Sequence, residues 1–240
     1  MDSVLRDINR EKSKMEDDVA NLNRHYEKLR GYVYEHLKQT TVEWARLVVD
    51  HPKALALIVE TSPIVDENGY ASSGGHEPIR FTACRFTDST ILLDQLLHPT
   101  HSREVGGAEY HGLTVFDVVD KPRLADVWPT IQEVLENRHL IIFGADWARG
   151  ALRSVLYASM LDNAFCLQNR CKEYYNQFYD LSLEAVLGYQ GIDKKREQLR
   201  DSRDRVLMLV QVVRNLAAGM AKQVQESEGD TLDDLDEHPF

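Results

Sequence analysis

The three cysteines are the side chains of this sequence that could support the widest range of chemistry. Cys84, Cys166 and Cys171 are odd in number and lack Cys-x-x-Cys spacing, so they predict neither a disulfide framework nor a zinc site. Cys171 is followed by Lys172, and no histidine is placed to act as the base of a cysteine nucleophile. We therefore expect three reduced thiols, in the core or on the surface of a cytoplasmic protein.

Several other polar positions are explained by local structure. Gly74-Gly75 predicts a loop and not a phosphate cradle, because no Gly-Lys-Ser/Thr sequence follows it. Asp146 stands at the start of a predicted helix, where an acidic side chain stabilises the first turn; the alternative is a displaced metal ligand. Glu197 and Asp204 are expected to be solvated partners of nearby arginines.

The formal charge of −11 is distributed unevenly along the 240 residues. Residues 1–40 contain equal numbers of acidic and basic side chains, whereas residues 225–240 contain seven acidic residues and no lysine or arginine. We expect this acidic tail to be disordered, because it has too little apolar surface to form a core. The region between them is slightly acidic, which argues against strong, non-specific binding of duplex nucleic acid.

The sequence contains no run of about 18 apolar residues that would predict a membrane span. Its N-terminus is charged throughout and lacks the apolar segment of a secretory signal. We therefore expect a cytoplasmic protein with no membrane partner.

Residues 1–38 follow a heptad pattern, which predicts a coiled-coil helix over residues 1–40. The two core positions hold Met1, Ile8, Met15, Leu22 and Leu29, and Leu5, Val19, Tyr26 and Val33, with Lys12 as the one polar exception. The expected oligomerisation contacts are Ile8, Met15, Val19, Leu22, Tyr26 and Leu29. Such a helix needs a partner, which is a second copy, a different coiled-coil protein, or a helix of the same chain.

From Thr41 onward the pattern becomes that of a globular α/β domain, which we place at residues 41–224. Short apolar or alternating runs predict strands at 54–59, 79–86, 90–97 and 140–145, with a turn-rich stretch at 63–78. Helical spacing is found near 41–50, 124–137, 147–161, 171–179, 181–187 and 194–224. This order favours a sheet with helices on its faces, and Trp44, Trp128 and Trp147 are expected in its core.

The order of these elements, together with several short motifs, resembles the DEDD (DEDDh, proofreading-type) 3′–5′ exonucleases. The stretch 110–114, Tyr-His-Gly-Leu-Thr, is similar to the family's Ile-His-Gly-Ile-Thr, and it follows Leu97-His98-Pro99, similar to Val-x-Pro, at the expected distance. Trp44-Ala-Arg and the stretch 171–179 resemble a bacterial subgroup. The resemblance covers residues from about 43 to 224. It implies an RNase H-like α/β fold, a mixed five-stranded sheet flanked by helices, behind the N-terminal coiled-coil helix.

The resemblance implies hydrolysis by two metal ions, which four carboxylates hold while a histidine acts as general base. The family's Asp-x-Glu-Thr reads Ile58-Val-Glu60-Thr61 here, so the glutamate and threonine match but the aspartate is lost. Its Asn-x-x-Phe-Asp reads 144–148, where Trp147 stands for the aromatic residue and Ala148 for the aspartate.

The family's His-x-x-Leu-x-Asp reads 196–201 here, so Asp201 matches and Arg196 replaces the base. Glu60 and Asp201 are therefore the candidate catalytic residues and metal ligands, as remnants of the four carboxylates. The expected cofactor is none, or one weakly bound Mg²⁺ or Mn²⁺. Candidate binding residues are Thr61, Trp147, Arg196 and His111. Arg196 is expected to pair with a remnant carboxylate or contact a phosphate, and His111 to be mainly structural.

Three functions are compatible with the sequence. The first is a catalytically degenerate exonuclease-like domain, a pseudoenzyme that binds single-stranded nucleic acid or a protein. It would assemble through its coiled coil as a homo-oligomer or with a partner protein. The second is a weakly active, divalent-metal-dependent 3′–5′ exonuclease with a rearranged site. The third is a scaffold protein with no nucleic-acid contact.

Overall fold

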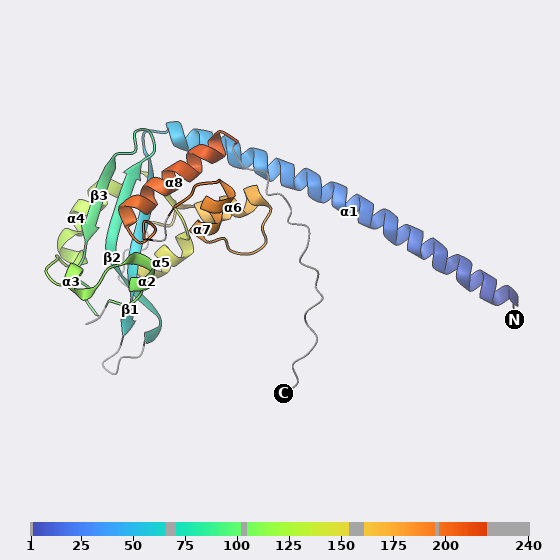
Figure 1. The fold of residues 1–240 in the computed structure, drawn as a ribbon, viewed down its shortest axis with the longest axis horizontal. Coiled ribbons are helices and arrows are strands. Elements are labelled where there is room, and N and C mark those ends of the chain that lie inside the picture. The colour runs from blue at the N-terminus through green and yellow to red at the C-terminus, as the bar shows by residue number, and fades with distance from the viewer. Residues whose placement is uncertain (1, 66–70, 102–104, 154–160, 195–196, 220–240) are drawn as a thin grey trace.

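The fold places one long N-terminal helix beside a five-stranded sheet that has helices on both faces (Figure 1). This computed structural model describes residues 2–65, 71–101, 105–153, 161–194 and 197–219. The predicted fold class, a mixed five-stranded sheet flanked by helices with an N-terminal helix, is confirmed. The acidic tail at 225–240 lies outside the described residues. Among the described helices, none combines the length and apolar character that crossing a bilayer requires.

Helix α1 runs without interruption from Asp2 to Asp50. The separate helix expected from Thr41 is therefore the last part of α1. No proline occurs before Pro52, and the one glycine in this stretch, Gly31, costs a helix only about 1 kcal/mol. Nothing in the sequence breaks the helix before the His51-Pro52 pair.

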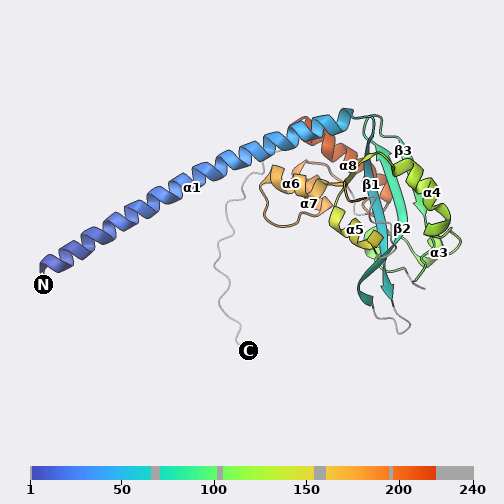
Figure 2. The ribbon, with the colours of Figure 1, turned by 180° about the vertical axis from the view of Figure 1, so that it is seen from behind.

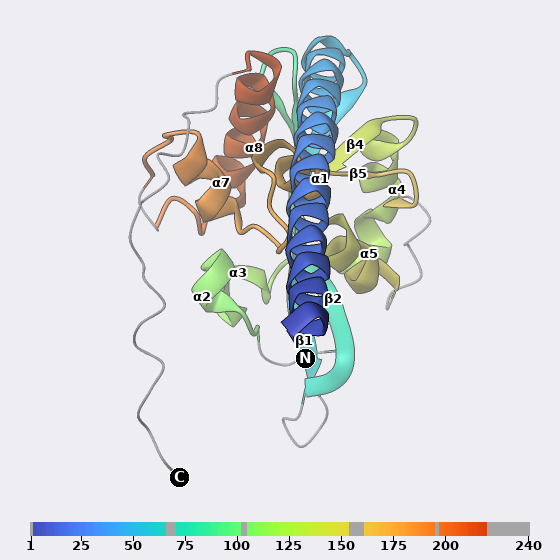
Figure 3. The ribbon, with the colours of Figure 1, turned by 90° about the vertical axis from the view of Figure 1, so that its right-hand side faces the viewer.

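The two halves of α1 have different surroundings. The C-terminal half lies against α8 (Ser202–Ala217) and α6 (Leu167–Tyr175), and its Thr41, Ala45 and Val48 are buried. The N-terminal half extends away from the domain as a rod (Figure 2). Two contacts mark the point where α1 leaves the domain. The Tyr34 hydroxyl donates a hydrogen bond to the Tyr174 carbonyl oxygen (3.2 Å), and the Arg30 guanidinium lies over the Phe178 ring. Figure 3, which looks along the rod, shows α8 beside α1.

The sheet has the strand order β3-β2-β1-β4-β5. Strands β1 (Ala54–Val65), β2 (Ala71–Arg85) and β3 (Ile91–Leu96) are antiparallel neighbours. Strands β4 (His139–Ile142) and β5 (Phe165–Cys166) are added in parallel to β1.

The turn-rich stretch expected at 63–78 is instead the far end of the β1–β2 hairpin. Gly74-Gly75, predicted as a loop, lies within β2. Val65 pairs with Ala71, and irregularities after Glu60 and Pro63 let the strands remain paired. Pro63 is paired with His76 despite its turn preference, whereas Gly74 and Gly75 fall in the irregularity between that pair and the Val65–Ala71 pair. The Asn68-Gly69 turn signal lies outside the described residues.

Alternation along the strands divides the core between the two faces of the sheet. Ala56, Ile58 and Cys84 contact the face covered by α1, α8, α6 (Leu167–Tyr175) and α7 (Leu183–Tyr189). Leu57 and Phe81 contact the opposite face, with α4 (Leu124–Leu135) and α5 (Ala145–Arg153). Two short helices, α2 (Ala108–His111) and α3 (Val115–Val118), lie between β3 and α4.

All three cysteines are free, as the sequence predicts. Cys84 and Cys171 are buried and Cys166 is half-buried. Burial raises the pKa of the Cys84 thiol to about 11, so that it remains protonated at neutral pH. These thiols have the character of small apolar core residues and not of nucleophiles.

Helix α8 spans Ser202–Ala217 and begins later than the predicted start near residue 194. Residues 197–200 form turns, and Asp201 caps the helix by accepting a hydrogen bond from the Arg203 backbone N–H (2.9 Å). The apolar residues that hold α8 in the core begin only at Val206. The described charged residues before Asp201, Lys194, Glu197 and Arg200, are exposed and lack this packing, so helical propensity alone does not extend the helix.

Candidate functional site

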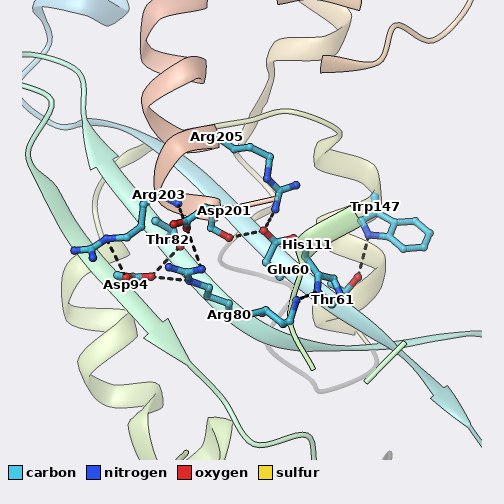
Figure 4. Close-up of polar contacts among 12 residues, drawn as sticks. Glu60, Thr61, Arg80, Thr82, Asp94, His111, Trp147, Asp201, Arg203 and Arg205 are labelled. Carbon is cyan, nitrogen blue, oxygen red and sulfur yellow. Dashed lines mark hydrogen bonds and ion pairs between the residues drawn. The ribbon is translucent and has the colours of Figure 1, made fainter. Parts of the chain in front are cut away.

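The candidate site lies where the start of α8 crosses β1 and β2, with Asp94 of β3 beside them (Figure 4). In the sheet register, Glu60 on β1 is paired with Arg80 on β2. In the next row Ile58 is paired with Thr82, which in turn is paired with Asp94 on β3. Because residues two apart on a strand face the same side, these side chains share the face that α8 covers.

Glu60 is buried, with only 6% of its surface exposed. Its carboxylate accepts a hydrogen bond from the Ser202 hydroxyl and forms an ion pair with Arg205, and both partners lie on α8. Burial lowers the pKa of the Arg205 guanidinium to about 10, which is still far enough above neutral pH for the group to stay charged. Arg205 Nε has no hydrogen-bond partner among the described residues, so the Glu60 ion pair is its main compensation.

A second part of the network is centred on Arg80. Its Nε donates to Asp94 Oδ1 (2.7 Å) and its Nη1 to Asp201 Oδ1 (3.2 Å). Asp94 also accepts a hydrogen bond from Thr82 Oγ1 (3.2 Å) and lies 3.3 Å from Arg203 Nε. We call the set Glu60, Arg80, Asp94, Asp201, Arg203 and Arg205 the arginine–carboxylate network.

The structure therefore places both predicted remnants, Glu60 and Asp201, in neighbouring ion-pair groups at the start of α8, and it pairs each with an arginine. Ile58 is half-buried against the core on the α8 face, and Ala148 is buried in the core on the other face. No group of three or more His, Cys, Asp or Glu side chains in the described parts of the chain could hold a metal ion. The described residues do not fit a two-ion centre, because guanidinium groups occupy the carboxylates that would bind the ions. Arg196 lies outside the described residues.

The predicted binding residues Thr61 and Trp147 form a second feature beside Glu60. Trp147 Nε1 donates to Thr61 Oγ1 (3.2 Å), and the Trp147 ring meets the His76 ring edge-on at a centroid distance of 4.2 Å. Trp147 is 57% exposed, so its expected place in the core is wrong. Trp44 and Trp128 do pack against the core. The Trp147 indole is held in place by Thr61 yet presents much of its surface to solvent.

His111 is buried at the end of α2, and its two described hydrogen bonds are with the backbone of its own loop. Its Nδ1 accepts from the Leu113 N–H (3.1 Å), so its Nε2 carries the proton and donates to the Gly106 carbonyl oxygen (2.9 Å). Gly107 and Gly112 on either side have φ values of +83° and +70°, which favour glycine. Burial lowers the pKa of His111, so that the neutral form is retained.

We predict that His111→Gln lowers the free energy of unfolding by about 1–3 kcal/mol at pH 7.5, because two buried hydrogen bonds are lost. The loss should be smaller at pH 5. Because its folded-state pKa is lowered, wild-type His111 binds a proton more readily when unfolded, and wild-type stability falls as the pH drops below the ordinary histidine pKa. The variant lacks this proton uptake. Urea unfolding at the two pH values tests this, and a deficit that widens at pH 5 would contradict it.

Asp146, the possible displaced ligand, lies at the start of α5 with an exposed side chain that forms an ion pair with Arg149. It contributes no described contact to the arginine–carboxylate network. Its position is that of a first-turn acid, where it also benefits from the helix dipole.

The family's motifs do not identify Arg80, Asp94, Arg203 and Arg205, because none of these residues stands at a motif position that was matched. Two signals in the sequence point to them. Arg80 alternates with the buried Ile79 and Phe81, which marks it as a polar residue on an otherwise apolar strand. Arg205 follows Asp201 by four residues, which is about one turn of a helix.

The solved structures that resemble this fold include the following two. Cell-death related nuclease 4 has a TM-score of 0.51 at 12% sequence identity, over 71% of this chain and 66% of that chain. The pseudoubiquitin-hydrolase–RNase module of PAN2 from Saccharomyces cerevisiae has a TM-score of 0.43 at 14% identity, over 71% of this chain and 30% of that one. This chain thus covers less than two thirds of either structure. No protein-family model and no curated protein matches the sequence.

The similarity to the nuclease establishes the fold. The chain has an exonuclease-type, RNase H-like α/β fold, as the motifs predicted. At 12% identity the similarity concerns the fold alone, and function has to be argued from the residues of the site.

Proposed function

We propose that this protein is a binding module on an exonuclease-type fold, in which arginine–carboxylate pairs have taken the place of metal-dependent hydrolysis. The observation that carries this proposal is the pairing of Glu60 with Arg205 and Ser202. An ion at Glu60 would have to displace Arg205 and leave a buried guanidinium without its partner, which costs several kcal/mol. Asp201, the other remnant, is already engaged by Arg80 and by its own helix.

The proposed ligand is single-stranded nucleic acid. Exposed aromatic rings bind such strands by stacking on the bases, at roughly 1–3 kcal/mol per base. Trp147 offers such a ring, and Thr61 fixes its orientation. On α8, Arg203 is 57% exposed and available for a phosphate. Because the chain as a whole is acidic, we expect the nucleic acid to bind only around Trp147 and Arg203, which we call the proposed surface. Assembly through α1 would present more than one copy of the surface.

A labelled single-stranded oligonucleotide separates the three candidate functions in one experiment. We expect fluorescence anisotropy to show binding that weakens with salt, and gel analysis to show no shortening of the strand with Mg²⁺ or Mn²⁺. Trp147→Ala should weaken binding about 5–100-fold, because a stacking surface is lost. Phe178→Ala is the matched control, since it removes an exposed ring near α1 that lies outside the proposed surface.

Each other outcome points to a different function. Shortening from the 3′ end that Glu60→Gln abolishes would establish a weakly active exonuclease. Absence of binding even at low salt would leave the scaffold function. Equal losses for the Trp147 and Phe178 variants would place the binding surface elsewhere.

A further inference from the structure

The rod of α1 carries an apolar surface that its own domain leaves uncovered. We call the set Met15, Val19, Leu22, Tyr26, Leu29 and Val33 the α1 stripe; each member is 54–68% exposed. Lys12 precedes the stripe and His36 follows it at the next core positions of the heptad. The stripe is therefore a block of six apolar positions with a basic or titratable residue at each end.

The globular domain of the same chain contacts a side of α1 other than the one that carries the α1 stripe. The buried residues of the C-terminal half, such as Thr41, Ala45 and Val48, lie off the heptad core positions of the stripe. The continuation of those core positions, His36, Thr40, Glu43 and Leu47, is exposed along the whole helix. A second helix can thus lie along the stripe and continue past the domain without displacing α6 or α8.

We infer that the α1 stripe is covered by the α1 stripe of a second copy running antiparallel, with a two-fold axis beside residue 24. This inference rests on the proposed self-assembly and adds its orientation. The stripe is symmetric about this axis, so Met15 faces Val33, Val19 faces Leu29, and Leu22 faces Tyr26 of the other copy. All six layers are then apolar, and Lys12 meets His36 just outside them.

Charges beside the core favour the same orientation. In the antiparallel register Glu16 lies next to Arg30 of the other copy, and this attractive pair occurs twice. A parallel, in-register pair instead places Lys12 against Lys12 in the core and Glu11 against Glu16 beside it. Parallel pairing would add layers at Leu5 and Ile8. In the antiparallel register the same N-terminal turns lie along the other copy's Thr40–Leu47, where Leu47 is exposed.

Spin-label distances in the full chain distinguish the two orientations. We would place one label at Arg10→Cys or Arg24→Cys, both on the outer side of α1, in a Cys166→Ser background; Cys84 and Cys171 are buried. Antiparallel pairing offsets the two residue-10 labels by about 42 Å along the axis, at 1.5 Å per residue. Parallel pairing gives no axial offset. Labels at residue 24 are level in both arrangements and serve as the control.

Charge exchange tests the same inference without labels. Glu16→Arg turns both cross-pairs into like-charge pairs and should raise the dissociation constant about tenfold, whereas Glu16→Arg with Arg30→Glu should restore it. Parallel pairing predicts the opposite for Glu16→Arg, which would relieve the contact with Glu11. A dimer with level residue-10 labels, or one tightened by Glu16→Arg, overturns the antiparallel arrangement but leaves self-assembly intact. A chain that sediments as a monomer overturns both.

Discussion

Replacing Arg205 with methionine should lower the free energy of unfolding by about 3–5 kcal/mol, because it leaves Glu60 buried beside Ser202 without its counter-charge. Methionine keeps much of the side-chain volume, so the loss reports on charge more than on packing. Urea unfolding followed by circular dichroism measures it, at one protein concentration because the proposed self-assembly would also contribute to stability.

Two variants show whether the loss comes from the ion pair. Arg203→Met removes a half-exposed arginine whose partner, Asp94, keeps Arg80 and Thr82, and should cost about 1 kcal/mol or less. Glu60→Gln combined with Arg205→Met should be less destabilised than Arg205→Met alone, because the buried charge is removed with its partner. If Arg205→Met costs no more than Arg203→Met, the network is not a buried ion-pair system.

Replacing Leu22 with aspartate should convert the assembled protein to a monomer. It places one charge from each copy in the central layers of the α1 stripe, which removes two leucines and desolvates two carboxylates. We expect the dissociation constant to rise by at least about a hundredfold, measured by light scattering across a concentration series. Helix content should change little, because the Leu22 side chain is 68% exposed on the N-terminal half of α1.

Ala20→Asp is the matched control for this experiment. It adds the same charge two residues away, on the outer side of α1, and should leave assembly unchanged. Deleting the N-terminal part of α1 should also give a monomer. The deletion must stop before Tyr34, because the Tyr34 hydroxyl donates to the Tyr174 carbonyl oxygen. A wild-type chain that is already monomeric would contradict the proposed self-assembly.

The sheet was predictable from the sequence where the strands are buried on both faces. The apolar run beginning at Ala54 and the alternating run beginning at Ile79 both define strands without reference to tertiary structure. The outer half of the β1–β2 hairpin was not predictable, because Pro63 and Gly74 favour turns, and only the pairs around them, Pro63–His76 and Val65–Ala71, reveal the strands. The start of α8 was set by a local hydrogen bond of Asp201, which periodicity does not register.

Two of the three carboxylates of the candidate site were predictable. Glu60 and Asp201 matched their motifs, and the structure places them in neighbouring ion-pair groups at the start of α8. The cationic half depends on contacts between elements that are far apart in the sequence. Arg80 reaches Asp201 across 121 positions, and Arg205 reaches Glu60 only because α8 crosses the sheet at β1. No motif on a single segment contains that information.

The unbroken course of α1 also determines how two binding surfaces would cooperate. Since the helix passes from the stripe into the core without a hinge, an antiparallel dimer holds its two domains apart at a fixed spacing, with the two Ala45 positions about 63 Å apart along the axis. A single-stranded nucleic acid too short to reach the Trp147 side chains of both copies would bind one domain at a time. A longer strand would engage both, and the second contact would be intramolecular, so its affinity would increase abruptly with length through avidity.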